Sequence, residues 1–176
     1  VIEIWPNLKE EIYGIALDIG STTISAHLVN LHTGVTIASA GEMNPQIRFG
    51  EDLMSRVSYV MMNSRGEEDL TKAVREGIQK LVNYATKKVK IEISDVLEIV
   101  FVGNPVMHHL FLGINPIELG GAPFALSIDD TFECLAKELD LSLSQGTRVF
   151  SLPCIAGHVG ADAASATLAE KPHKKT

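Results

Sequence analysis

The sequence predicts an α/β fold built on one mixed β-sheet, and three observations support this prediction. Three short apolar, β-branched runs follow one another early in the chain, separated only by tight turns. Later apolar runs alternate with segments that carry helical periodicity. The chain has 176 residues, 45% of them hydrophobic, which is enough for one domain with a substantial core.

The opening of the chain is predicted to form three consecutive strands. An apolar run over residues 13–18 ends in a turn, which is typical of a buried strand. A second strand is predicted over residues 24–31 and, after the turn signal at 32–34, a third over 35–40. Because tight turns join neighbouring strands as hairpins, these three strands should be antiparallel. Residues 1–12 are expected to be a linker or an edge strand.

Helices and strands then alternate. Residues 52–62 could form a helix, and residues 69–88 have apolar side chains at the three-to-four spacing of one buried face. A β-branched strand is predicted over residues 96–102. Pro105 suits the first turn of the helix that follows, which is expected to run to about Leu112.

The last third of the chain is predicted to hold an insertion and a final strand–helix pair. The insertion spans about residues 113–146, with one short helix near 131–139. A strand over 148–152 and an Ala-rich helix over 160–169 follow. The order β-β-β-α-β-α-β-α is that of the ribonuclease H-like mixed sheet. Nucleases, sugar kinases, actins and chaperone ATPases share this order, so the fold alone does not identify the chemistry.

One domain is expected to span residues 13–170, with a second insertion at about 44–67 and a flexible tail at 171–176. The net charge of −7 argues against a nucleic-acid-binding surface. No run approaches the roughly 20 apolar residues of a membrane span. Cys134 and Cys154 are far apart and form no metal or disulfide pattern, which indicates a cytosolic setting with reduced thiols.

A turn rich in small and hydroxyl residues lies between the first two strands. Gly20 lets the backbone turn tightly and approach a ligand. Ser21, Thr22 and Thr23 offer hydroxyl and N–H groups that can surround phosphate oxygens. Asp18 can hold Mg²⁺ through a water, because Mg²⁺ usually keeps several waters. An ordinary hairpin turn is the alternative, but the surrounding element order favours phosphate binding.

Two polar residues near the ends of later elements are further candidates for catalysis. Asn104 follows the fourth strand and could position the attacking water or a phosphate, although it also suits a helix cap before Pro105. Asp162, in the first turn of the last helix, could act as a general base or orient water if that turn faces the cleft. A nuclease would need several carboxylates converging on its metal. The strand ends offer Asn104 and residues 156–157 instead, which disfavours a nuclease.

Other marked side chains are expected to be structural. His108 and His109 are adjacent in a predicted helix, so their side chains point about 100° apart and cannot easily share one metal. We expect one to pack inside and the other to face a partner, and neither to bind cobalt. His158 is expected to orient or stabilise its loop. The following methionines are expected to fill the core: Met54, Met61, Met62 and Met107.

The polar stretch at residues 44–50, continued by Glu51, Asp52 and Arg56, interrupts the pattern of strands and helices. Such loops usually carry contacts rather than fold stability. We interpret it as a surface for a partner protein or a neighbouring subdomain. A plain surface loop followed by a helix capped at Asp52 is the alternative.

Several of these stretches resemble one protein family. Residues 17–23 are similar to the first phosphate motif of the acetate and sugar kinase, chaperone and actin group. Four further stretches are more specific: residues 43–56, 102–113, 121–124 and 152–162. Together they are similar to the C-terminal actin-like ATPase domain of the reductive activators of corrinoid proteins. The resemblance covers nearly the whole chain after Tyr13 and implies that the chain is the first half of that domain.

The resemblance also implies ligands and partners. In such activators ATP, bound with Mg²⁺, helps to drive an electron from an N-terminal 2Fe–2S ferredoxin domain to an inactive Co(II) corrinoid protein, which regenerates Co(I). The ferredoxin cysteines and the second actin-like half are absent from this sequence. We therefore expect no iron–sulfur cluster on this chain, and weak or no ATPase activity from it alone. The expected partners are a corrinoid protein, the ferredoxin domain and the second half.

Two other functions stay open. A small-molecule kinase of the same superfamily would bind a sugar or an acyl acid in the cleft, but the insertions are comparatively apolar for a substrate pocket. A non-enzymatic docking module for a corrinoid protein would work without nucleotide, so it would not depend on Asp18.

Overall fold

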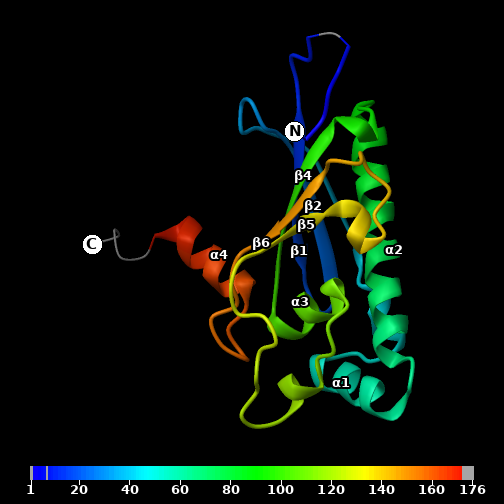
Figure 1. Ribbon diagram of the computed structural model, residues 1–176, viewed down its shortest axis with the longest axis vertical. Coiled ribbons are helices and arrows are strands. Elements are labelled where there is room, and N and C mark those ends of the chain that lie inside the picture. Colours follow the sequence, from blue (N-terminus) through cyan, green and yellow to red (C-terminus); the bar gives the residue numbers. More distant parts are fainter. Residues whose placement is uncertain (1, 7, 172–176) are drawn as a thin grey trace.

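A six-stranded mixed sheet forms the centre of the molecule, with the strand order β3-β2-β1-β4-β6-β5 (Figure 1). The computed structural model describes residues 2–6 and 8–171. The predicted tail at 171–176 therefore lies outside the described residues except for its first position. Residues 2–6 and 8–12 contain no strand, so this part of the chain does not extend the sheet.

The first three strands are antiparallel neighbours, as predicted: β1 (Tyr13–Ile19), β2 (Thr23–Asn30) and β3 (Thr36–Met43). On the other side of β1, β4 (Val96–Gly103) and β6 (Arg148–Ser151) continue the sheet as parallel strands. An α/β ribonuclease H-like sheet is therefore confirmed. The carboxyl ends of β1 and β4 lie side by side, because Asp18 pairs with Val102 and Ile19 with Gly103.

The predicted short helix near residues 131–139 is wrong for the first half of this range. The structure has a short strand β5 (Phe132–Leu135), antiparallel to β6 at the sheet edge, and then a single 3-10 turn over Ala136–Leu139. Pairing with β6 overrides the local helical preference of this segment. Asp140, at a φ of 56°, ends the turn in the left-handed region before a helix can form.

Four α-helices accompany the sheet at the other predicted places: α1 (Leu53–Met62), α2 (Gly66–Val89), α3 (Pro105–Leu112) and α4 (Ala161–Glu170). α2 packs against β2 and β3, and α3 packs against α2 and β4. α4 contacts β4, and Figure 1 shows it projecting away from the sheet on the side opposite α2. No helix in the described part of the chain is long and apolar enough to span a membrane.

The core lies between one face of the sheet and α2 with α3. α2 begins at Gly66 rather than at residue 69, and its predicted apolar face is buried: Leu70, Val74, Ile78, Leu81, Val82 and Ala85. Alternate residues of β1 face this core, where each fully buried Ile or Leu contributes about 1.5–3 kcal/mol. The other alternate residues, Ala16 and Asp18, are exposed. The strand pattern therefore places Asp18 on the open face, at the carboxyl end of β1.

Candidate functional site

The turn between β1 and β2 is tight and leaves two backbone donors open. Gly20 N–H donates to the Thr23 carbonyl oxygen at 3.0 Å. A Cβ on Gly20 would lie 2.6 Å from that oxygen, so only glycine fits this approach. The N–H groups of Ser21 and Thr22 make no hydrogen bond to any other described residue. The turn thus has two adjacent N–H groups and nearby hydroxyls available to a ligand, which is the arrangement that suits phosphate oxygens.

The start of α4 brings a second carboxyl group toward Asp18. A Cβ on Gly160 would lie 2.4 Å from the Gly103 carbonyl oxygen and 2.7 Å from Asn104 Cα. Glycine therefore lets the chain cross directly over the β4–α3 junction. Asp162 follows in the first turn of α4. The structure brings all three predicted catalytic residues, Asp18, Asn104 and Asp162, to the same end of the sheet.

The pKa of Asp18 is raised, chiefly because neighbouring protein atoms remove part of its hydration and then because of the charge of Asp162. His27, on the adjacent strand, acts in the opposite direction. Two carboxylates that repel each other suit a shared hard cation, since oxygen is the ligand that Mg²⁺ prefers. The described residues contain no cluster of three or more His, Cys, Asp or Glu side chains that could hold a metal. A bound Mg²⁺ would therefore take most of its ligands from water and phosphate, as Mg²⁺ usually does.

Asn104 is a helix cap. Its Oδ1 accepts a hydrogen bond from Met107 N–H at 3.0 Å, with Pro105 at the first position of α3. This confirms the capping interpretation. A role in positioning water or phosphate stays a prediction, and it would fall to the side-chain Nδ2, which is not used by the cap.

The predicted surface segment at residues 44–56 is partly buried, and the prediction is wrong for three of its polar residues. Asn44, Gln46 and Arg56 are all fully buried. The alternative of a helix capped at Asp52 is confirmed, since the Asp52 carboxylate accepts from Ser55 N–H at 2.7 Å. We call Asn44, Gln46 and Arg56 the backing cluster, because they lie behind the β1–β2 turn.

The backing cluster holds the carbonyl oxygens of the turn. Asn44 donates from Nδ2 to the Gly20 oxygen at 2.8 Å and from its backbone N–H to the Thr22 oxygen at 2.8 Å. Arg56 donates from Nη2 to the Ser21 oxygen between them. A signal for Arg56 was present in the sequence: it falls on the inward face of α1 with the apolar positions 53, 57 and 60, at the spacing of a buried stripe.

Both adjacent histidines are buried, so the expectation that one faces a partner is wrong. His109 lies with Nδ1 at 2.8 Å from the Pro105 carbonyl oxygen, and its Nε2 accepts from Ser127 N–H at 3.1 Å. The ring is therefore neutral, with its proton on Nδ1. His108 packs beside Phe101, and burial lowers its pKa to about 4. Neither ring is accessible to a cobalt ion.

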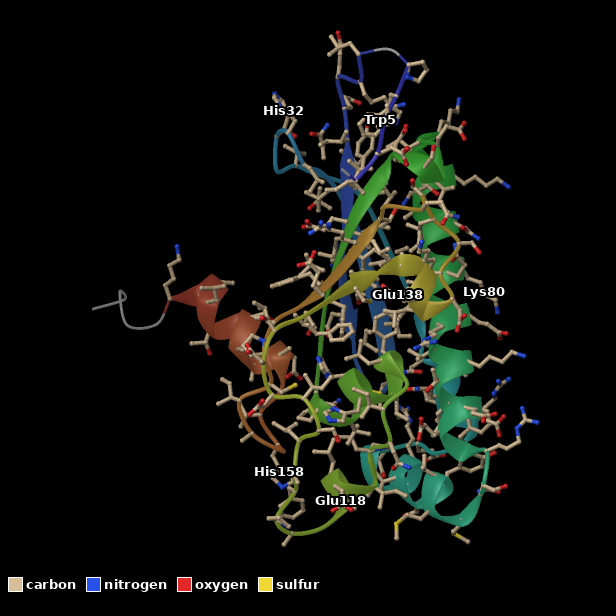
Figure 2. All side chains as sticks on the ribbon, in the orientation of Figure 1. Trp5, His32, Lys80, Glu118, Glu138 and His158 are labelled. Atoms are coloured by element: carbon tan, nitrogen blue, oxygen red, sulfur yellow. The ribbon has the colours of Figure 1, made fainter. Side chains whose placement is uncertain are left out.

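His158 and the methionines complete the comparison with the predictions. His158, labelled in Figure 2, lies in the loop before α4 with its ring 4.2 Å from that of Phe124, which agrees with a structural role. Met107 is buried as predicted. The core prediction is wrong for Met54, Met61 and Met62, which are exposed on α1. They lie off the inward stripe of that helix, and apolar character alone did not reveal this.

The chain is similar to known proteins over nearly all of its length. A family model described as the RACo middle region matches residues 13–175. The curated "Corrinoid activation enzyme RamQ" from Eubacterium limosum is 32% identical over 99% of this chain. A solved structure of a "Reductive activator for corrinoid,iron-sulfur protein" is 33% identical and superposes with a TM-score of 0.89 over 92% of this chain.

The chain spans 30% of the length of the curated relative and 26% of the solved one. The matching family model describes a middle region, whereas the resemblance in the sequence was to the C-terminal domain of these activators. The family model, the curated relative and the solved structure all point to the same group of proteins. This chain belongs to the RACo middle region family.

Proposed function

We propose that this chain supplies the phosphate-binding part of an ATP-dependent activator that reduces an inactive Co(II) corrinoid protein to Co(I). One observation carries the proposal: the β1–β2 turn presents two N–H groups with no partner among the described residues, close to Asp18 and at the sheet end where Asp162 also lies. The names of the two relatives, which refer to corrinoid activation, support the choice of reaction.

The residues would share the work as follows. Ser21 and Thr22 would bind phosphate oxygens with their N–H groups, and with Thr23 would add hydroxyl donors. Asp18 would hold a water of the Mg²⁺ shell, and Asp162 would orient the attacking water or accept its proton. When bound, Mg²⁺ supplies positive charge that offsets the phosphate and the two carboxylates.

The rest of the activity would come from elsewhere in the protein. We propose that a 2Fe–2S ferredoxin domain delivers the electron, that a second actin-like half closes over the nucleotide, and that a corrinoid protein docks nearby. Within this chain, residues 13–170 would form the first actin-like subdomain. A cytosolic setting is supported by Cys134 and Cys154, which are free thiols.

The test is ATP-dependent cobalt reduction by the natural full-length protein, with Co(I) appearance and phosphate release followed in the same cuvette. We expect Asp18→Asn to abolish ATP-dependent Co(I) formation, because the neutral amide lacks the negative charge that attracts Mg²⁺ and its bound water. Glu92→Gln is the matched control. Glu92 is an exposed carboxylate that precedes β4, at the opposite end of the sheet, and its loss should leave the rate unchanged.

Two results would overturn the proposal. Cobalt reduction that needs no ATP, or that survives Asp18→Asn, would favour a docking role without nucleotide. Phosphate transfer to glycerol, a sugar or acetate, at a rate that the corrinoid protein does not change, would favour a kinase.

A further inference from the structure

Arg56 is an unusual residue to find behind a phosphate-binding turn, because its side chain is fully buried and no acidic side chain pairs with it. It is among the largest completely buried side chains of the protein. Within residues 2–6 and 8–171, no carboxylate lies within ion-pair distance of its guanidinium. Burying a charge without a counter-charge is costly, so such a residue needs an explanation.

The hydrogen-bond partners of the guanidinium are all neutral groups. Nε donates to the Gly50 carbonyl oxygen at 3.0 Å, and Nη2 donates to the Ser21 oxygen. Nη1 lies 3.3 Å from Gln46 Oε1 and 2.9 Å from Met107 Sδ, on α3. These contacts fix the orientation of the guanidinium, but none of them carries a negative charge.

Desolvation lowers the pKa of Arg56 to about 10, and the carboxylate of Asp52, one turn earlier, opposes this only in part. Asp52 is exposed and uses its oxygen to cap α1. The 3-10 turn Pro45–Arg48, α3 and the β1–β2 turn contribute only amide, thioether and carbonyl groups to this contact. Arg56 therefore stays a cation whose charge is balanced only in part, by Asp52, from within the described protein.

The backing cluster also decides which way the turn's amides point. In a planar trans peptide, the carbonyl of one residue and the N–H of the next point in opposite directions. Asn44 and Arg56 hold the carbonyl oxygens of Gly20 and Ser21 behind the turn. The N–H groups of Ser21 and Thr22, which belong to those two peptides, must then face the opposite side. Neither of these two N–H groups has a hydrogen-bond partner among the described residues.

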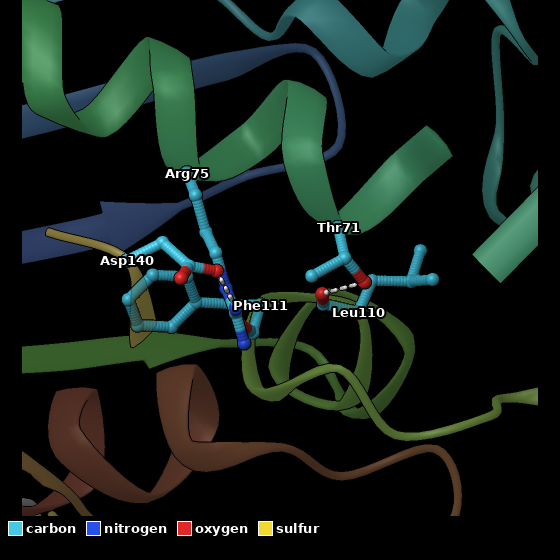
Figure 3. A network of polar contacts seen from close by, with 5 residues as sticks. All are labelled: Thr71, Arg75, Leu110, Phe111 and Asp140. Carbon is cyan, nitrogen blue, oxygen red and sulfur yellow. Dashed lines mark hydrogen bonds and ion pairs between the residues drawn. The ribbon is translucent and has the colours of Figure 1, made fainter. Parts of the chain in front are cut away.

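Arg75 provides an internal comparison, because it performs the same kind of clamping with its charge balanced (Figure 3). It donates from Nε to the Phe111 carbonyl oxygen at 3.0 Å and from Nη1 to Asp140 Oδ2 at 2.8 Å. Its side chain is nearly buried, at 12% exposure. Arg75 thus shows how this fold satisfies an arginine whose role is structural.

We propose that Arg56 is a positioning residue for the phosphate site: it holds the Ser21 carbonyl behind the turn, and the phosphate group of the nucleotide supplies its missing counter-charge across the turn. The inference rests on the proposed function, which makes the turn a phosphate site. It adds a residue and a physical role that lie outside the turn itself.

The first experiment measures Mg–ATP affinity of the natural full-length protein by calorimetry, with Arg56→Met and Arg75→Met compared in parallel. Both changes remove a carbonyl clamp, but only the first removes the unbalanced charge behind the turn. Arg56→Met should weaken ATP binding about 10-fold or more, the size expected for losing a charge-assisted hydrogen bond. Arg75→Met should bind ATP within about 2-fold of wild type, whatever it does to stability.

The second experiment uses Arg56→Lys, which keeps the charge and does not depend on the folding of the methionine variant. A lysine in the same desolvated place, with no carboxylate in ion-pair contact, should have its pKa lowered by about 3 units from the usual value of about 10.4. Its ATP affinity relative to wild type should be nearly retained at pH 6 and should fall as the pH rises to 9. The ratio to wild type at each pH removes the titration of the nucleotide itself.

The outcomes separate this inference from the proposed function. If wild type and Arg56→Met bind ATP with equal affinity, the positioning role is overturned while the phosphate site stands. The same holds if the ATP affinity of Arg56→Lys equals that of wild type at every pH. Equal losses of affinity in Arg56→Met and Arg75→Met would also overturn it, because they would indicate a general loss of structure. If wild type binds no ATP, the proposed function fails, and the counter-charge role fails with it.

Discussion

Two arginines clamp backbone carbonyl oxygens in this domain, and they differ in what balances their charge. Arg75 ties α2 to the end of α3 and pairs with Asp140 at the surface. Arg56 ties α1 to the β1–β2 turn in a fully buried place where all its hydrogen-bond partners are neutral. The contrast teaches that the fold can balance an arginine when stability is its only role. An arginine left unbalanced next to an open turn is more simply explained by a ligand of opposite charge.

His108 shows a third way in which this protein buries an ionisable side chain. Its ring nitrogens have no hydrogen-bond partner among the described residues, and its pKa is lowered to about 4. Histidine can therefore enter the core by losing its charge, which arginine cannot do at physiological pH. The retained charge of Arg56 is therefore a stronger indication of an anionic ligand than its burial alone.

The largest expected effect on stability comes from Asn44→Ala. It removes the donor to the Gly20 oxygen and the acceptor of Gln46 N–H, both in a fully buried place. Leaving two buried groups unpaired should lower the free energy of unfolding by about 2 to 4 kcal/mol, as measured by urea denaturation. Asn83→Ala, at an exposed site on α2, should change it by less than about 0.5 kcal/mol. Equal losses of stability in Asn44→Ala and Asn83→Ala would show that the buried hydrogen bonds of Asn44 contribute no more to stability than an exposed asparagine does.

His108 should make the protein sensitive to acid. A base whose pKa is lower in the folded state binds fewer protons when folded, so its contribution is fully present above the unfolded pKa of about 6.5. That contribution should be lost as the pH falls from about 6.5 to 4, by up to about 3 kcal/mol. Unfolding measured at several pH values should show that the free energy of unfolding depends less on pH over this range in His108→Phe than in wild type.

The exposed His32 offers the control for this measurement. His32→Gln, in the turn after β2, should keep the pH dependence of wild type. If His108→Phe also keeps it, His108 binds a proton as readily in the folded protein as in the unfolded chain, and its contrast with Arg56 disappears.

The smallest effect is expected for Asp140→Asn. Asp140 is 80% exposed, so its ion pair with Arg75 is well solvated and should be worth about 0–1 kcal/mol. Asparagine also tolerates the left-handed backbone at this position. The change in unfolding free energy should shrink further in 0.5 M salt. A decrease in unfolding free energy of more than about 2 kcal/mol would mean that the ion pair between Arg75 and Asp140 stabilises the fold far more than an exposed pair should.

Local patterns predicted most of the fold and the residues that meet at one end of the sheet, Asp18, Asn104 and Asp162. The opening strands, α2 and α3 follow from apolar periodicity, and the turn at Gly20 follows from its small and hydroxyl residues. The edge strand β5 was missed because its structure depends on pairing with β6, which lies later in the chain.

The backing cluster was missed for a similar reason. Polar residues after a strand suggest a surface loop, and only the fold shows that Asn44 and Arg56 reach the carbonyls of Gly20 and Ser21. Their partners are separated from them by 24 and 35 positions along the chain. The inward face of α1, which includes Arg56, was the one sequence feature that pointed to its burial.

Hydrogen exchange measured by mass spectrometry tests most directly whether the β1–β2 turn binds nucleotide. The natural full-length protein would be compared with and without saturating Mg–ATP. The Ser21 and Thr22 amides have no partner among the described residues. In peptides covering residues 18–23, these two amides should exchange rapidly without nucleotide and become protected when nucleotide binds. Unchanged exchange in this turn, with protection appearing elsewhere in the protein, would contradict the assignment of the phosphate site.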